Sequence, residues 1–201
     1  GAGSRSPTAG STTRPSDWSD AGGRISVTYG WLHDQTQRLA NALKDRGIGK
    51  GDVVGIFMPM VPEAAVAMLA CARIGAVHNV VFGGFSAGSL RERMEFSEAR
   101  ALITADATLR RGNPMPMKSA IDDALETLPA METVVVFDRC GTEPPMKDGR
   151  DLDWATALAG SDPVCEPEAM DAEDPLFLLY TSGSTAKPKG IVHTTGGYLT
   201  Q

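Results

Sequence analysis

The chain has 201 residues, and its hydrophobic content of 42% is enough to build one globular core. It carries 19 Lys and Arg against 25 Asp and Glu, which gives a formal net charge of −6 without a long run of either sign. This balance argues against nucleic acid as a partner. Because no apolar stretch approaches the roughly 18 residues that a membrane helix needs, and no signal peptide opens the sequence, we expect a cytoplasmic protein without a membrane partner.

The spacing of cysteine and histidine argues against a metal site. Cys71, Cys140 and Cys165 are odd in number and far apart, so we expect three ordinary thiols rather than disulfides or zinc ligands. His33 and His78 have no ligand partner at a useful spacing either. These residues therefore predict no metal bound by the chain itself.

The first part of the chain differs in composition from the rest. Residues 1–20 are built mainly from Gly, Ser, Thr, Pro and Arg, with hardly any apolar side chain to anchor them. We therefore predict a disordered tail over residues 1–22 and a folded domain over residues 23–201.

From Ile25 onward, short apolar runs alternate with amphipathic stretches, as strands and helices do in a parallel α/β sheet. Thr28 is placed to cap a helix that ends before Gly47, and Pro62 suits the first turn of a second helix. Arg91 and Arg93, on a later helix, are expected to be surface charges. The remaining expected elements are strands at 53–57, 76–82, 101–104 and 133–137, helices at 89–98 and 119–128, a loop at 140–150, and the start of a helix at the final residues.

The last expected strand, 176–180, runs directly into a segment rich in Thr, Ser, Gly and Lys. In such a segment, backbone N–H groups and hydroxyls can converge on one anion while lysine adds positive charge. It is not a Walker motif, because Lys187 is followed by Pro188 instead of Ser or Thr. Composition alone leaves a second interpretation open, a polar surface loop after an edge strand.

Residues 180–190 resemble the phosphate-binding signature of the adenylate-forming superfamily over eleven consecutive positions. Residues 191–199 are similar to the acetyl- and propionyl-CoA synthetase branch, as are residues 58–65, 68–76 and 80–86. The resemblance covers about residues 24–201. It implies an α/β fold in which a mostly parallel sheet is flanked by helices, as part of the family's large N-terminal (AMP-binding) domain, with the C-terminal remainder absent.

The resemblance also implies a reaction. ATP and acetate would give an acetyl-adenylate and pyrophosphate, and CoA would then displace AMP, so that ATP, Mg²⁺ and CoA are the implied small-molecule partners. Propionate is the alternative acid. Because the family's catalytic lysine comes from later chain, no catalytic residue maps here, and we expect this chain alone to be inactive. The alternative function is a non-catalytic fragment that at most binds nucleotide.

Carried over residue by residue, the resemblance implies two sets of ligand contacts. Ala186 departs from the family pattern, which has glycine there, and Asn113 stands where the family has a second arginine. From the residues alone, a Gly-Gly pair is more often a turn, and a lone Arg a solvated charge. The implied contacts to the ATP phosphates are Thr181, Ser182, Gly183, Ser184, Thr185, Lys187 and Lys189, and those to CoA are Phe82, Gly83, Gly84, Arg110 and Arg111.

Overall fold

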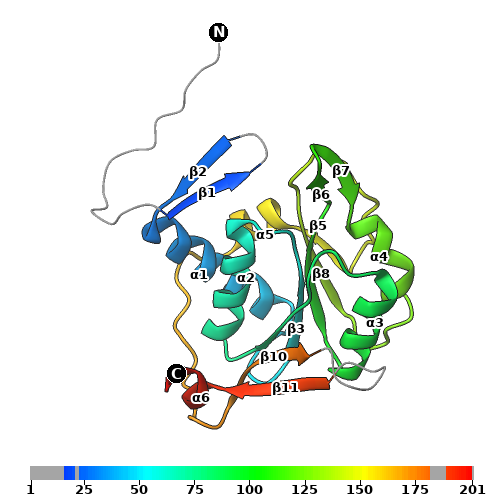
Figure 1. Ribbon diagram of the computed structural model, residues 1–201. Coiled ribbons are helices and arrows are strands. Elements are labelled where there is room, and N and C mark those ends of the chain that lie inside the picture. The colour runs from blue at the N-terminus through cyan, green and yellow to red at the C-terminus, as the bar shows by residue number, and fades with distance from the viewer. Residues whose placement is uncertain (1–15, 21–22, 182–188, 201) are drawn as a thin grey trace.

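The computed structural model describes residues 16–20, 23–181 and 189–200, and its centre is a seven-stranded sheet (Figure 1). The predicted mostly parallel sheet flanked by helices is confirmed. Every neighbouring pair of strands in it is parallel except the pair at residues 175–181 and 189–194, which is antiparallel. In spatial order the strands are β11 (Lys189–Thr194), β10 (Pro175–Thr181), β4 (Val77–Val80), β3 (Val53–Phe57), β5 (Ala101–Ala105), β8 (Thr133–Phe137) and β9 (Asp151–Asp153).

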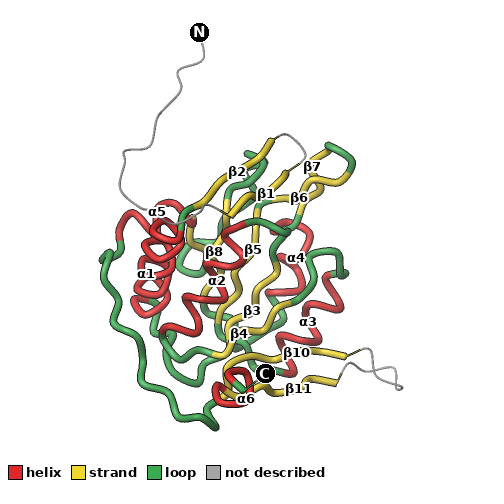
Figure 2. Tube along the Cα trace, turned by 60° about the vertical axis from the view of Figure 1, so that its left-hand side comes forward, coloured by secondary structure: helices red, strands yellow, loops and turns green. Residues whose placement is uncertain are grey.

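Helices cover both faces of this sheet (Figure 2). One face carries α1 (Tyr29–Asp45), α2 (Pro62–Arg73) and α5 (Trp154–Gly160), and the other carries α3 (Ala87–Phe96) and α4 (Lys118–Leu125). The short helix α6 (Thr195–Leu199) follows β11. Two separate hairpins complete the described fold: β1 (Ser16–Asp20) with β2 (Gly23–Val27), and β6 (Ala107–Arg110) with β7 (Asn113–Pro116).

Local signals placed most of the expected elements correctly. The Thr28 hydroxyl accepts a hydrogen bond from the Trp31 backbone N–H at 3.1 Å and caps α1, and Pro62 is the first residue of α2. Strands β3 and β8 have the predicted bounds, and β5 extends one residue further. Helices α3 and α4 begin one or two residues earlier than expected and also end earlier.

Most of the elements that the sequence did not predict depend on strand pairing. These are β9, β11 and the β6–β7 hairpin, and the helix α5 was also missed. Residues 16–20, inside the segment predicted to be disordered, form β1 and pair with β2. Backbone hydrogen bonds across a hairpin need no apolar anchor, which is why composition did not reveal this strand. Residues 1–15 lie outside the described part, and the boundary between tail and domain stays a prediction.

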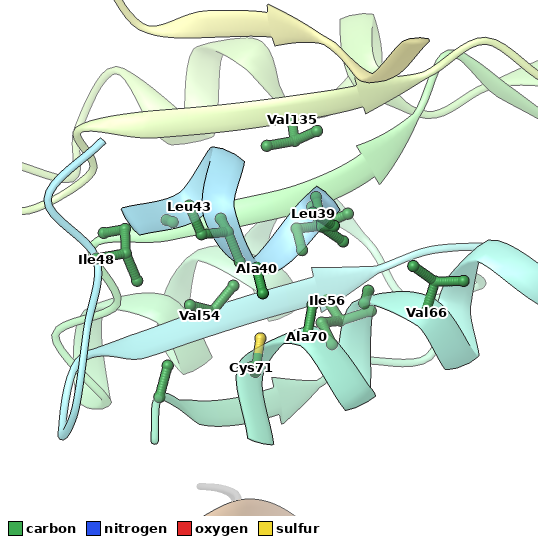
Figure 3. Close-up of a cluster of buried hydrophobic side chains, with 14 of the residues drawn as sticks. Leu39, Ala40, Leu43, Ile48, Val54, Ile56, Val66, Ala70, Cys71 and Val135 are labelled. Carbon is green, nitrogen blue, oxygen red and sulfur yellow. The ribbon is translucent and has the colours of Figure 1, made fainter. Parts of the chain in front are cut away.

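Two apolar clusters hold the layers together. The first lies under α1 and α2, where Leu39 and Leu43 meet Val54, Ile56 and Val66 (Figure 3). The second lies under α3 and α4 and includes Leu90, Met94, Leu102, Ile121 and Val134. All ten side chains are at least 98% buried. Because both faces of the sheet are covered, β3, β5 and β8 are nearly continuous apolar runs, as the sequence indicated.

Gly55 in β3 allows α3 to lie close to the sheet. A Cβ at this position would lie 2.3 Å from the Met94 sulfur and 2.8 Å from a Leu102 methyl carbon. Real Cβ atoms do not approach so closely, so any side chain here would displace the buried side chains of Met94 and Leu102.

A buried ionic cluster joins α4 to β9. Lys118 Nζ lies 2.8 Å from an Asp151 oxygen and 2.6 Å from an Asp122 oxygen, and Arg150 Nε lies 2.6 Å from the other Asp151 oxygen. The Lys118 and Asp151 side chains are 1% and 0% exposed. Burial raises the pKa of Asp151, but hydrogen bonds from Arg150 and Lys118 outweigh it and hold the pKa below the ordinary range. The carboxylate is therefore stable only while its two cations remain in place.

We predict that Asp151→Asn lowers the free energy of unfolding by about 2–4 kcal/mol, because it leaves buried Lys118 and Arg150 with one carboxylate fewer. Urea unfolding at pH 7 measures this change, with the exposed Asp148→Asn as the matched control. The folded-state pKa of Asp151 is lowered, so its contribution is present above the unfolded pKa of roughly 4 and is lost as pH falls through the folded value. The difference between wild type and Asp151→Asn should therefore shrink in acid; a constant difference would contradict the prediction.

Candidate functional site

The loop after β4 carries Phe82, Gly83 and Gly84, the first group of expected CoA contacts. The Val81 N–H donates to the Ile56 carbonyl at 2.9 Å, so the chain stays attached to β3 as it leaves the sheet. A Cβ on Gly83 would lie 2.9 Å from the Met58 carbonyl oxygen and 3.3 Å from the Met117 methyl carbon. Only glycine permits this close approach, which sets the loop between the end of β3 and the start of α4.

The same loop presents an aromatic ring beside bare backbone. The Phe82 side chain is 68% exposed and meets Phe85 edge to face, with ring centroids 5.9 Å apart. A Cβ on Gly84 would lie 2.6 Å from the Phe82 ring, so the absence of a side chain at Gly84 lets the ring lie against its own loop. An exposed ring beside two glycines, which carry no side chains, is a surface that a ligand can approach closely.

Arg110 and Arg111, the second group of expected CoA contacts, lie at the tip of the β6–β7 hairpin. Arg110 is paired with Asn113, which leaves Arg111 and Gly112 as the two turn residues. Their φ angles are +53° and +80°, as in a type I′ turn, whose twist suits a two-residue hairpin. Both arginines are exposed, and with Asn113, Pro114 and Met115 they line an open depression of about 340 Å³.

Asp106 fixes the base of this hairpin, and the sequence analysis missed it. Its side chain accepts hydrogen bonds from the backbone N–H groups of Arg139, Cys140 and Thr142 at 2.9, 3.1 and 3.0 Å, and from the Thr142 hydroxyl at 3.0 Å. Burial raises the pKa of Asp106, but these hydrogen bonds bring it below the ordinary range. The sequence did contain a signal for this role, because Asp106 is an acidic residue that directly follows the buried strand β5.

The expected ATP-phosphate contacts fall only partly within the described residues. Thr181 and Lys189 are register partners at the open end of the β10–β11 pair, and both are exposed. The pairing of β10 with β11 makes the signature segment a connection between antiparallel strands, which the sequence analysis did not foresee. The other expected contacts, and the Ala186 departure, lie outside the described residues: Ser182, Gly183, Ser184, Thr185 and Lys187.

Aromatic stacking seats β10 against β4. The Phe177 ring lies between His78 and His193, with centroid distances of 5.3 and 4.4 Å. Farther along β10, the Tyr180 hydroxyl donates to the Arg93 carbonyl at 3.3 Å and accepts from Asn79 Nδ2 at 3.5 Å. Burial lowers the pKa of His78 to about 4, so its ring is neutral at pH 7.

We predict that acid weakens the fold through His78. Its folded pKa lies below the unfolded value of roughly 6.5, so the stability that neutral His78 supports is complete above pH 6.5 and is lost as pH falls towards 4. The loss over that window should reach about 1–2 kcal/mol. Urea unfolding of wild type and His78→Phe, which keeps a ring against Phe177, measures it. Equal slopes for the two proteins between pH 6.5 and 4.5 would contradict the prediction.

Within the described ranges, no helix combines the length and the apolar character needed to cross a bilayer. Within the same ranges, no group of three or more His, Cys, Asp or Glu side chains is arranged to hold a metal ion.

Comparison with known proteins identifies relatives of this chain. Residues 9–201 match the family model described as AMP-binding enzyme. An acetyl-coenzyme A synthetase of Pasteurella multocida (strain Pm70) is 57% identical over 182 residues, which are 90% of this chain and 28% of that relative. Acetyl-coenzyme A synthetase 2 of Pseudomonas aeruginosa is 57% identical over 173 residues, which are 86% of this chain and 27% of that relative.

A solved structure shares the fold. The acetoacetyl-CoA synthetase from Streptomyces lividans superposes with a TM-score of 0.80 at 34% identity, over 88% of this chain and 27% of that one. The chain therefore spans a little over a quarter of the length of the relatives that it matches.

Proposed function

Because the chain belongs to the AMP-binding enzyme family, we propose that the complete protein carrying it is an ATP-dependent acetate–CoA ligase. The observation that carries this proposal is the 57% identity to two acetyl-coenzyme A synthetases over nearly the whole chain. The fold is also shared with a ligase whose name gives a different acid, acetoacetate. Acetate is therefore proposed from the more similar relatives, with propionate as the alternative acid.

The proposed reaction has two steps. A carboxylate oxygen of acetate attacks the α-phosphorus of ATP, and pyrophosphate leaves. The sulfur of CoA then attacks the acyl carbon, loses its proton, and AMP leaves, so that acetyl-CoA, AMP and pyrophosphate are formed. In the first step an anion approaches a triphosphate, so cations and N–H groups around the phosphates must stabilise the negative charge.

We assign that task to the signature segment. Thr181 and Lys189 flank it from paired strands, which brings a hydroxyl and an ammonium group to its two ends. Ser182, Gly183, Ser184, Thr185 and Lys187 complete the proposed set from outside the described residues. Mg²⁺ would enter with ATP, bound by phosphate oxygens, and the proposal assigns it to no side chain of this chain.

CoA is proposed to bind Phe82, Gly83, Gly84, Arg110 and Arg111. Local charge supports this part of the proposal, because residues 107–117 contain two arginines and no acidic residue in a chain of net charge −6. The guanidinium groups of the hairpin tip suit phosphate groups, which arginine can bind through two parallel hydrogen bonds. The proposal includes a cytoplasmic location, and small molecules as the partners.

The first prediction from this function concerns the complete protein. It should catalyse exchange of pyrophosphate into ATP that depends on acetate, and it should form acetyl-CoA when CoA is added. Absence of acetate-dependent exchange in a folded, complete protein would contradict the proposal. A higher kcat/KM for propionate than for acetate would instead favour the alternative acid. The 201-residue chain by itself should form no acetyl-CoA; nucleotide binding without turnover would match the fragment alternative.

The second prediction separates the CoA contacts from the ATP contacts. Arg110→Ala should raise the KM for CoA about five- to fiftyfold, because a charge-assisted contact to phosphate is lost. The acetate-dependent exchange reaction needs no CoA and serves as the internal control, so its rate should change less than twofold. An unchanged KM for CoA would indicate that Arg110 is a solvated surface charge and not a CoA contact.

A further inference from the structure

Arg93 is held between two aromatic rings that belong to different parts of the proposed site. Its guanidinium carbon lies 4.7 Å from the centroid of Phe85 and 5.2 Å from the centroid of Tyr180. Phe85 packs on Phe82 in the proposed CoA loop. Tyr180 precedes Thr181 at the end of β10, where the phosphate signature begins. The expectation that Arg93 is merely a surface charge is therefore wrong.

Hydrogen bonds fix the guanidinium and the backbone around it. Arg93 Nη1 donates to the Ser89 carbonyl at 2.7 Å. The Arg93 carbonyl accepts from the Ser97 hydroxyl at 2.8 Å and from the Tyr180 hydroxyl at 3.3 Å. Tyr180 thus contacts both ends of the same residue, its ring facing the guanidinium and its hydroxyl bonded to the backbone.

Arg91, on the same helix, shows what an ordinary surface arginine looks like here. Arg91 Nη1 pairs with a Glu95 oxygen at 2.9 Å, four residues along α3, and the Arg91 side chain is 38% exposed. Among the described residues, Arg93 makes no such ion pair, and its charge faces the two rings instead. A cation over an aromatic face is attracted by the ring quadrupole, and this attraction is stronger where water is partly excluded.

We propose that Arg93 is a positioning residue that couples the CoA loop to the phosphate-binding segment. This inference rests on the proposed function, because it assigns the two rings to the two substrate sites. A displacement of Phe85 when CoA binds would move the Arg93 guanidinium. The moved guanidinium would in turn shift Tyr180, which lies next to the phosphate-binding segment. Coupling of this kind is reciprocal, so a change at Tyr180 must also alter the binding of CoA at its loop.

The first test replaces the cation in the complete protein. Arg93→Met keeps an unbranched apolar side chain and removes the charge, so it should raise the KM for CoA about two- to tenfold and slow acetate-dependent pyrophosphate exchange by a similar factor. Arg91→Met is the matched control and should change neither. Arg93→Lys keeps a charge over the rings and should partly restore both. Arg93→Met values equal to those of Arg91→Met would overturn the proposal.

The second test measures the coupling itself by crossed effects. Tyr180→Leu, on the phosphate side, should raise the KM for CoA, and Phe85→Leu, on the CoA side, should slow pyrophosphate exchange. Both crossed effects should vanish when the same changes are made in Arg93→Met, because the connecting group is gone. A merely structural role would leave the crossed effects of equal size in both backgrounds, and that result would overturn the proposal.

A failure of the coupling can be told apart from a failure of the proposed function. A wild-type protein without acetate-dependent exchange would refute the function, whereas an active wild type without crossed effects would refute only the coupling. If Arg93→Met does not fold, as judged by thermal unfolding, Phe85→Leu decides alone. Phe85 is 44% exposed, so its replacement is compatible with folding, and an unchanged exchange rate in that variant would overturn the inference.

Discussion

Parallel pairing within one buried sheet is the constraint on which the other features depend. Strands β10, β4, β3, β5, β8 and β9 all run in the same sense, so their carboxyl ends point the same way. Most of these parallel strands are joined by crossovers that contain a helix, and the helices cover both faces with apolar side chains. The loops at the carboxyl ends of the strands lie outside these apolar layers, and such loops are where ligands bind in open α/β sheets.

Two buried acidic residues hold the loops on the β5–β8 side of the sheet. Asp106 accepts hydrogen bonds from the backbone N–H groups of Arg139, Cys140 and Thr142 at the base of the β6–β7 hairpin, and Asp151 is held by Lys118 and Arg150. In both cases hydrogen bonds offset the burial of the carboxylate and leave its pKa below the ordinary range. The exposed arginines of the hairpin tip are thus carried by a rigid base, although the tip itself faces solvent.

The distribution of charge suits two anionic substrates on an acidic protein. The net charge of −6 is spread over the chain, whereas the hairpin tip and the strands flanking the phosphate signature present arginine and lysine. Arg93 carries a charge that faces the aromatic rings of Phe85 and Tyr180 rather than a carboxylate. This one guanidinium therefore connects two segments that are far apart in the sequence, the loop at 82–85 and residue 180. No single motif contains this connection.

The sequence by itself determined the elements whose signals are local. The Thr28 cap, the first-turn Pro62 and the apolar runs of β3, β5 and β8 each act within a few residues, and the signature at 180–190 is contiguous. Tertiary structure alone decided the features that need a distant partner. β11 exists because it pairs with β10, Asp106 becomes an anchor only beside residues 139–142, and Arg111 accepts a positive φ because β6 and β7 pair around it. Arg93 looked like Arg91 in the sequence because a cation–aromatic contact depends on folding, which brings Phe85 and Tyr180 to the same guanidinium.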